Sequence, residues 1–321
     1  MILSMNPPYD ITGKIMKLVA SISKSLGEID ANYLTKQSPQ LRKQNRIQTI
    51  HSSLQIEGNT LSEEHVTALL EDKKVIGPEK DILEVKNAIQ VYHQLNNFKI
   101  TSDSSFLKAH QILMNGLVSE AGKYRKRSVG IAKGNQIEHI APPYENVPFL
   151  MKDLFNYLKN PDELTLIKSC VFHYEMEFIH PFIDGNGRMG RLWQTLILMQ
   201  EFPVFEFSPF ETLIQKTQTN YYKALADSDK IGKSTPFIEY MLDVIDLSLK
   251  QQLNYNNRIL KDTDRLEYFL SITTTQFTRK DYMNVFKDIS SATASRDLKK
   301  GIELKLFKKS GEQNKTVYDV D

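Results

Sequence analysis

Hydrophobic residues recur at intervals of three and four along most of the chain, which is the spacing of one face of an α-helix. The clearest groups in the first hundred residues are Ile15, Leu18, Val19 and Ile22, then Val66, Leu69 and Leu70, then Ile82, Val85, Ile89 and Tyr92. Residues 58–60 interrupt the pattern, and Ser62 with the two acids after it has the composition of a helix start. We therefore predict an N-terminal helical region over residues 1–100.

The pattern changes in the middle of the chain. A further amphipathic helix is expected over residues 101–123 and should end near Gly122. Short apolar runs of β type then flank Gly134 and Asn135, a turn pair typical of a hairpin. Two prolines end the second run, because proline cannot continue a strand ladder. We predict a small β-hairpin over residues 129–143.

Helical patterns return after the hairpin, over residues 147–158 and 164–178. The second stretch is strongly apolar, which predicts a helix buried in the centre of a domain. It ends at His180, because a residue that precedes proline is pushed out of the α region. A glycine-rich loop at residues 184–187 follows, and a new helix is expected over residues 188–200.

The last part of the chain has a different pattern. Residues 248–261 are polar enough for an exposed helix or a linker, and we place a domain boundary near residue 255. Beyond it, helical patterns precede two short β-type runs, an order typical of a winged helix. We predict three parts: a helical region of residues 1–100, a core of residues 101–255, and a winged-helix domain of residues 256–321.

Composition narrows the class of protein. With 321 residues, 40% of them hydrophobic, the chain is long enough to bury a core and to form more than one domain. Its single cysteine, Cys170, cannot form an intramolecular disulfide, which favours the reducing cytoplasm. No stretch approaches the roughly 20 apolar residues of a membrane helix, so no membrane association is expected. The net charge of +2 gives no overall basic field, so a surface for nucleic acid would have to be local.

The loop between the two central helices carries groups suited to phosphate chemistry. Gly185 and Gly187 let backbone amides approach an anion, and the start of the next helix adds amide donors and a positive dipole end. Asp184 is placed to bind Mg²⁺, which favours a carboxylate together with nucleotide phosphates. The loop therefore predicts a phosphate site with a magnesium ion.

Three further side chains complete the predicted site. Arg188 and Arg191 are three residues apart, so they share a face of the new helix and are able to clamp phosphate oxygens. A histidine at position 180 titrates in the range suited to taking a proton from an attacking hydroxyl. Together with the loop, these residue types predict phosphoryl or nucleotidyl transfer.

Plainer interpretations stay open beside this one. A glycine-rich loop alone is usually a turn, and a histidine at a helix end is usually structural. His173, His180 and Asp184 also form a set able to bind a transition metal, although the two arginines would repel a bare cation. Four other isolated histidines are expected to be structural or on the surface: His51, His65, His93 and His110.

The twelve residues HPFIDGNGRMGR, from His180 to Arg191, resemble the signature of the Fic family, HPFx(D/E)GNGRxxR, at every fixed position. The resemblance implies a Fic-fold helical bundle with a small β-hairpin flap, and transfer of AMP from ATP to Ser, Thr or Tyr hydroxyls of target proteins. It implies that His180 is the general base and Asp184 the Mg²⁺ ligand. The residues that it assigns to ATP are Gly185, Asn186, Gly187, Arg188, Gly190, Arg191, Tyr221 and Asp229. Among these, Asp229 stands where the family's pattern has asparagine.

Two regions outside the signature extend the resemblance. The hairpin would be the flap, which aligns a target segment by strand addition. Its target-binding residues would be Ile137, Glu138, His139 and Ile140. Ser53, Glu57 and Gly58 match an inhibitory motif of the family, (S/T)xxxE(G/N). Its glutamate pairs with the second arginine of the signature, here Arg191, and so would keep the γ phosphate out of its site.

The predicted winged helix resembles DNA-binding modules appended to bacterial members of this family. Residues 296–315 hold seven Lys or Arg against three acids, a local charge of +4, although the segment from residue 262 onward is close to neutral. DNA binding and a protein-packing role are therefore both open. The expected partners are ATP, target proteins, the chain itself as a substrate, and a second copy in a homodimer. Rival functions are transfer of another group, removal of AMP, and DNA-binding regulation with the core as a sensor.

Overall fold

The computed structural model describes residues 7–33, 39–133, 136–257, 262–273, 276–286, 289–311 and 316–320. The chain divides into two compact units, residues 1–253 and 254–321. Helices dominate the described part of both units, and a two-stranded antiparallel sheet is present in each. The prediction of a mainly α fold with a small hairpin is confirmed.

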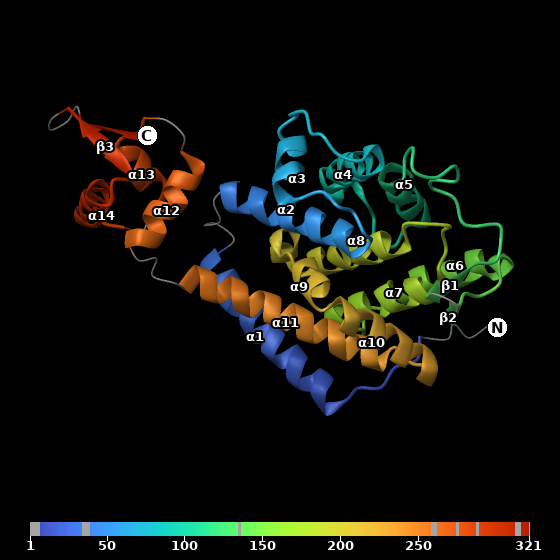
Figure 1. The fold of residues 1–321 in the computed structure, drawn as a ribbon. Coiled ribbons are helices and arrows are strands. Elements are labelled where there is room, and N and C mark those ends of the chain that lie inside the picture. The colour runs from blue at the N-terminus through green and yellow to red at the C-terminus, as the bar shows by residue number, and fades with distance from the viewer. Residues whose placement is uncertain are drawn as a thin grey trace. The chain divides into compact units, whose positions relative to one another are not determined.

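The first unit is a bundle of helices (Figure 1). Its elements are α1 (Gly13–Tyr33), α2 (Pro39–Ile56), α3 (Glu63–Leu70), α4 (Glu79–Tyr92), η1 (Leu95–Asn97), α5 (Asp103–Leu113), β1 (Gly130–Lys133), β2 (Gln136–Ile140), η2 (Tyr144–Asn146), α6 (Val147–Tyr157), α7 (Thr165–Ile179), α8 (Asn186–Met199), η3 (Pro203–Phe207), α9 (Glu211–Lys216), α10 (Gln218–Ile231) and α11 (Thr235–Asn257). α1 and α11 lie side by side, where Lys14 pairs with Asp243 at 2.5 Å. Within the described ranges, every helix is too short or too polar to span a lipid bilayer.

Helices α7 and α8 pack against each other in the core of this unit, and side chains such as Cys170 and Phe172 are fully buried. The prediction of a buried helix over residues 164–178 is therefore confirmed. The ring of Phe106 on α5 has its centroid 4.9 Å from that of Trp193 on α8 and 5.4 Å from that of Phe182 in the loop. This aromatic cluster ties the loop to the hydrophobic core.

Helix boundaries follow the predicted signals at α3, where the Ser62 side chain caps the first turn. The helix expected over residues 101–123 was predicted wrongly, since α5 ends at Leu113. The chain then turns, and Gly122 adopts a φ of 77°, which is open to glycine at little cost. The amide of Gly122 donates to the ring of His110 at 2.9 Å, so the segment folds back on the helix instead of extending it.

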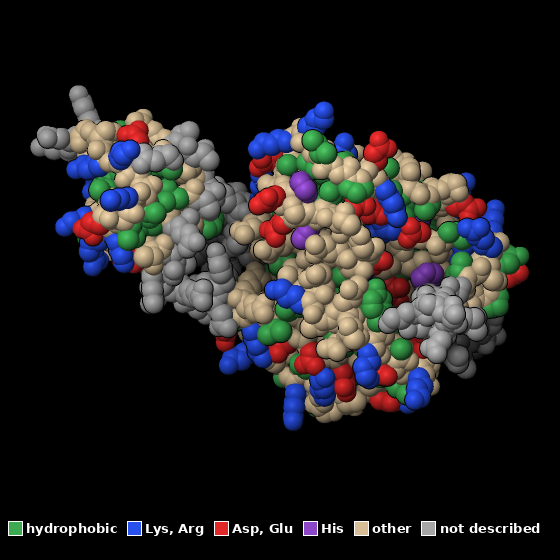
Figure 2. All heavy atoms as spheres, viewed as in Figure 1, with side chains coloured by type: hydrophobic (Ala, Val, Ile, Leu, Met, Phe, Trp, Pro, Cys, Tyr) green, Lys and Arg blue, Asp and Glu red, His purple; other side chains and the backbone are tan. Residues whose placement is uncertain are grey.

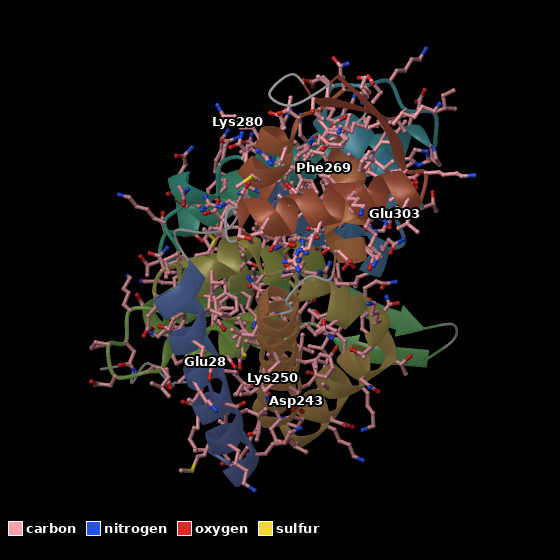
Figure 3. The ribbon with its side chains drawn as sticks, turned by 90° about the vertical axis from the view of Figure 1, so that its left-hand side faces the viewer. Glu28, Asp243, Lys250, Phe269, Lys280 and Glu303 are labelled. Atoms are coloured by element: carbon pink, nitrogen blue, oxygen red, sulfur yellow. The ribbon has the colours of Figure 1, made fainter. Side chains whose placement is uncertain are left out.

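The C-terminal unit contains α12 (Asp262–Ile272), α13 (Arg279–Val285), α14 (Ser291–Glu303), β3 (Phe307–Ser310) and β4 (Val317–Val320). Figure 3 labels Phe269 on α12, Lys280 on α13 and Glu303 on α14. Arg265 of α12 donates twice to Asp297 of α14, at 2.6 and 2.9 Å, and fixes these two helices to each other. Helices followed by a hairpin are the order expected from the sequence, while the winged-helix assignment stays a prediction.

Candidate active site

The glycine-rich loop joins the end of α7 to the start of α8. α7 ends at Ile179, and His180 adopts a left-handed backbone conformation with φ 50° and ψ 59°. Gly185 has a φ of 86°, and α8 begins at the next residue. The Asn186 side chain fixes the loop, because its Nδ2 donates to the Phe182 carbonyl and its Oδ1 accepts from the Phe182 amide, both at 2.9 Å. These hydrogen bonds fix the backbone of the loop and therefore the positions of the first amides of α8, which lack partners within the helix.

The loop forms part of the wall of a cavity of about 280 Å³, near the lower end of the range for small-molecule sites. Other walls come from α7, α10 and the end of α2. The predicted site residues that line it are Glu57, His180, Asp184, Gly185, Asn186, Gly187, Tyr221 and Asp229. Figure 2 shows acidic and histidine side chains together at a recess in the surface of this unit. One cavity therefore gathers residues from three separate parts of the sequence: Glu57, residues 177–187 and residues 221–229.

His180 lines this cavity at the end of α7. Its Nδ1 lies 3.4 Å from the carbonyl oxygen of Glu177, which is long for a hydrogen bond. Because a carbonyl oxygen only accepts, this contact favours the tautomer with the proton on Nδ1. Nε2 then carries the lone pair that a general base needs.

Arg191 is fully buried and is held by α2. Its Nε donates to the Ser53 hydroxyl at 3.0 Å, and its Nη2 donates to the Ser53 carbonyl at 2.9 Å and to Glu57 Oε1 at 2.7 Å. Burial alone would lower the pKa of Arg191, but the charge of Glu57 raises it, and the net shift is upward. In the described part of the chain, its Nη1 is buried without a hydrogen-bond partner.

Glu57 also lies against the first turn of α8. A side chain added at Gly187 would collide with the Glu57 carboxylate, so glycine is required for this approach. The carboxylate therefore occupies a place where helix amides and the dipole favour an anion. Gly58 follows with a φ of 90°, just beyond the end of α2.

Arg188 has a different set of partners. Its Nη1 donates to Glu84 of α4 at 3.0 Å, and its Nη2 donates to Asp184 at 2.9 Å. The other oxygen of Glu84 accepts from the Asn59 side chain at 2.8 Å. Arg188 thus joins the predicted magnesium ligand to an acid of the N-terminal helices.

Tyr221 belongs to a buried polar network beside the cavity. The His173 ring has its Nδ1 2.6 Å from Gln194 Oε1 and its Nε2 3.0 Å from the Tyr221 hydroxyl. Burial lowers the pKa of His173 to about 3, so the ring is neutral. Both ring nitrogens are engaged, which argues against the alternative metal site that includes His173.

Gly190 lies outside the cavity lining and faces this network. A Cβ at Gly190 would lie 2.6 Å from the His173 ring, so the glycine allows α7 and α8 to approach each other closely. Asp229 does line the cavity, and it accepts a hydrogen bond from the Tyr174 hydroxyl at 2.8 Å. An ATP contact for either residue stays a prediction.

The hairpin predicted as the flap is formed by β1 and β2. The strands pair antiparallel, with Gly130 opposite Ile140, and the register shifts once between Ile131 and Ala132. The backbone of the proposed target-binding residues lies in β2: Ile137, Glu138, His139 and Ile140. Their side chains fall outside what the structure describes.

Three side chains at the loop were not predicted as part of the site: Glu84, His110 and Arg125. The His110 ring stacks on Phe182 at 3.6 Å, and its Nε2 lies 3.0 Å from the Asp184 carbonyl. Burial lowers the pKa of His110 to about 4, so the neutral ring donates to that carbonyl. No local pattern marks these residues, because their partners are distant in the sequence.

Comparisons with known proteins agree with this geometry. A model of the Fic/DOC family matches residues 100–198, which run from just before α5 into α8. The crystal structure of a Fic family protein from Desulfovibrio desulfuricans G20 is 38% identical, with 99% of this chain and 98% of that chain covered and a TM-score of 0.77. The chain belongs to the Fic family. The Fic fold expected from the signature is therefore confirmed.

Curated relatives of this Fic chain carry a functional name. Protein adenylyltransferase fic-1 of Caenorhabditis elegans is 29% identical over 217 residues, which are 64% of this chain and 40% of that protein. Protein adenylyltransferase Fic of Nematostella vectensis is 29% identical over 214 residues, which are 62% of this chain and 47% of that protein. Each match spans less than half of the relative's length.

Proposed function

We propose that this Fic family chain is a protein adenylyltransferase that rests in an autoinhibited state. The observation that carries the proposal is the contact of Glu57 with Arg191 at the start of α8, in a cavity also lined by His180. An acid is placed where helix amides and a buried arginine would otherwise hold a phosphate. The names of the curated relatives support the same activity.

In the proposed reaction, a target Ser, Thr or Tyr hydroxyl attacks the α phosphorus of ATP while His180 Nε2 takes its proton. A bond forms between the hydroxyl oxygen and the α phosphorus, the bond to the β-phosphate oxygen breaks, and pyrophosphate leaves. The amides of α8 and Arg188 stabilise the α and β phosphates, and Arg191 binds the γ phosphate. Tyr221 and Asp229 would hold the adenosine part.

Asp184 fits a Mg²⁺ ion that arrives with the nucleotide. Its side chain is 46% exposed and lines the cavity, so it is open to a cation held between protein and phosphates. Among the described residues there is no cluster of three or more His, Cys, Asp or Glu for a metal. This donor set suits Mg²⁺, which is usually bound by one or two carboxylates with substrate phosphates. When bound, the ion would neutralise charge on the phosphates.

Glu57 would inhibit the reaction by competing for Arg191. The arginine cannot pair fully with both the carboxylate and a γ phosphate, and the two anions repel each other. ATP would then bind with its α phosphate out of line with the attacking hydroxyl.

Target recognition would use the flap. A two-stranded hairpin leaves edge backbone groups that can pair with an extended segment, which explains how unrelated proteins could present a hydroxyl. We also propose that the chain modifies itself, forms a homodimer and acts in the cytoplasm.

Labelled ATP tests the activity. Glu57→Gly should raise incorporation of AMP from α-labelled ATP into lysate proteins or into the chain at least tenfold over the unchanged protein. His180→Ala in the same background should remove it, and mass spectrometry should find a single AMP on hydroxyl side chains. Incorporation from another nucleotide, or loss of AMP from a modified target, would favour the rival transfer reactions. No incorporation by the Glu57→Gly protein would refute the proposal.

DNA binding is a second candidate function, carried by a groove in the C-terminal unit. Arg279, Lys280, Lys299 and Lys309 line it, and its described lining includes no acid. Figure 2 shows Lys and Arg side chains on this unit. Duplex DNA should shift in a gel at 50 mM salt and much less at 200 mM, and Lys299→Glu should weaken the shift. An equal effect of Lys24→Glu on α1 would contradict this assignment.

A further inference from the structure

Arg125 is a buried arginine that binds the backbone. The residue is 2% exposed and lies in the turn region between α5 and β1. Within the described residues, the hydrogen bonds of its guanidinium go to carbonyl oxygens: those of Arg127, Pro142, Ile179 and His180, at 2.5 to 3.3 Å. Four of the five donors of an arginine fork are therefore used on main-chain groups from three segments.

One set of these carbonyl acceptors lies at the end of α7. The carbonyls of Ile179 and His180 accept from the Arg125 side chain, and the carbonyl of Pro181 accepts from the Arg125 amide at 2.9 Å. The last carbonyls of a helix lack partners within the helix, and a cation there also interacts favourably with the dipole. Three successive carbonyls around the proposed base are thus satisfied by one residue.

His180 needs such support. Its φ of 50° lies in the left-handed region, where a residue with a side chain is strained and persists only if its surroundings hold it. Arg125 holds the peptide groups on both sides of His180. The direction of the imidazole from the backbone therefore depends on this guanidinium.

The other two carbonyl acceptors lie at the two ends of the flap. Arg127 precedes β1 and Pro142 follows β2, and their carbonyls accept from Nη1 and Nη2 at 3.0 and 2.5 Å. The planar guanidinium thus closes the base of the hairpin. The same guanidinium binds the carbonyls at the end of α7, so one side chain holds both the hairpin and the backbone of His180.

We infer that Arg125 is a positioning residue that sets the flap and His180 in one fixed geometry, so that a hydroxyl aligned on the flap meets the base. The inference rests on the proposed adenylyl transfer. Lysine cannot reproduce this arrangement, because its ammonium donates from one nitrogen, whereas the guanidinium makes four hydrogen bonds from three nitrogens held in one plane. ATP binding should not depend on Arg125, since this residue lies outside the cavity lining.

Hydrogen–deuterium exchange of the full chain tests the geometry without using activity. Arg125→Lys should raise early deuterium uptake at least threefold in residues 126–143 and in residues 179–186, with uptake in α1 and α11 unchanged. Arg127→Lys is the matched control, because its side chain is exposed, and it should change neither segment. Arg125→Gln is measured as well, so that loss of the fold in one variant does not end the test. Uptake that stays unchanged in both Arg125 variants, or rises equally throughout the unit, would overturn the inference.

Activity separates the inference from the proposed function. In the Glu57→Gly background, Arg125→Lys should lower kcat for labelled AMP incorporation about tenfold or more, with KM for ATP within about twofold, since small misplacement of a reacting group is costly. If the Glu57→Gly protein transfers nothing, the proposed function fails, while the exchange experiment still decides the role of Arg125. If transfer is equal with and without Arg125→Lys, the positioning role fails and the proposed function stands.

Discussion

Arg188 and Arg191 lie three residues apart on α8, yet the structure holds them in different ways. The acid that pairs with Arg191 is Glu57, which comes from just beyond α2, lines the cavity and has a side chain that is 27% exposed. Arg188 pairs with Asp184 of the loop and with Glu84 on α4, whose side chain is 7% exposed and also accepts a hydrogen bond from Asn59. One helix therefore carries two arginines of the same signature in two environments.

This difference indicates that the Glu57–Arg191 contact can be broken by a ligand. The Glu84–Arg188 contact, in contrast, is part of the enclosed framework that supports the site. A carboxylate at a cavity can be replaced on its arginine by water or by phosphate oxygens. When a carboxylate enclosed among protein groups is removed, the positive charge of its arginine partner stays buried without compensation. In the proposed enzyme, Arg191 would change partners, while Arg188 would keep Glu84 throughout.

The largest effect is expected from Glu84→Gln. The change leaves the buried Arg188 without a charged partner on α4, and we expect a loss of about 3 kcal/mol in the free energy of unfolding, the low end for a broken buried pair because Asp184 remains. Urea unfolding measures it. Glu79→Gln at the exposed start of the same helix is the control and should cost less than about 1 kcal/mol. A loss no larger than that of the control would break the comparison.

The sequence predicted the local parts of this site well and its distant supports poorly. Helical spacing and the proline after His180 predicted the helices on either side of the loop, because each signal lies within a few residues of its effect. Glu84 was missed because helical periodicity identifies only the hydrophobic face of a helix. An acid in such a helix is assumed to be exposed, and the pattern gives no sign that this one is buried. Arg125 has no helical or strand pattern around it, and its partners are brought to it only by the fold.

A resemblance, and not a pattern, brought Glu57 and Arg191 together. The two residues are 134 positions apart, and no spacing rule joins such positions. The structure contains their ion pair, while the inhibitory role stays a proposal. The early end of α5 was missed for a related reason, because the contact of Gly122 with the His110 ring depends on a turn that amphipathic spacing does not report.

A second acid, Glu211, lies near Arg191 and would neutralise it when Glu57 leaves only if its carboxyl is ionised. Glu211 is fully buried, and burial raises its pKa to about 8, although the nearby charge of Arg191 lowers it. An acid whose folded pKa is raised contributes stability that is full below its unfolded pKa of about 4.5 and is lost as pH rises towards 8. Glu211→Gln should therefore gain stability over the unchanged protein as pH rises, by about 2 kcal/mol between pH 6 and 8.

Urea unfolding at both pH values measures this difference, with Glu64→Gln on the exposed start of α3 as the control. A difference that is constant with pH would mean that Glu211 is ionised throughout and serves as a counter-charge for Arg191. The comparison would then fail, because Arg191 would have an enclosed acid of its own, as Arg188 has.

The smallest stability effect is expected from Glu57→Gln. The glutamine oxygen can still accept from Arg191, and both contacts with Ser53 remain, so we expect a loss of about 1 kcal/mol or less. The same variant should bind ATP with Mg²⁺ more tightly, because the γ phosphate no longer meets a fixed negative charge. Its melting temperature should then rise more on adding ATP than that of the unchanged protein, as binding to the folded state requires. A stability loss as large as that of Glu84→Gln, with no larger response to ATP, would show that Glu57 is a framework acid like Glu84, and the two arginines would then be held in the same way.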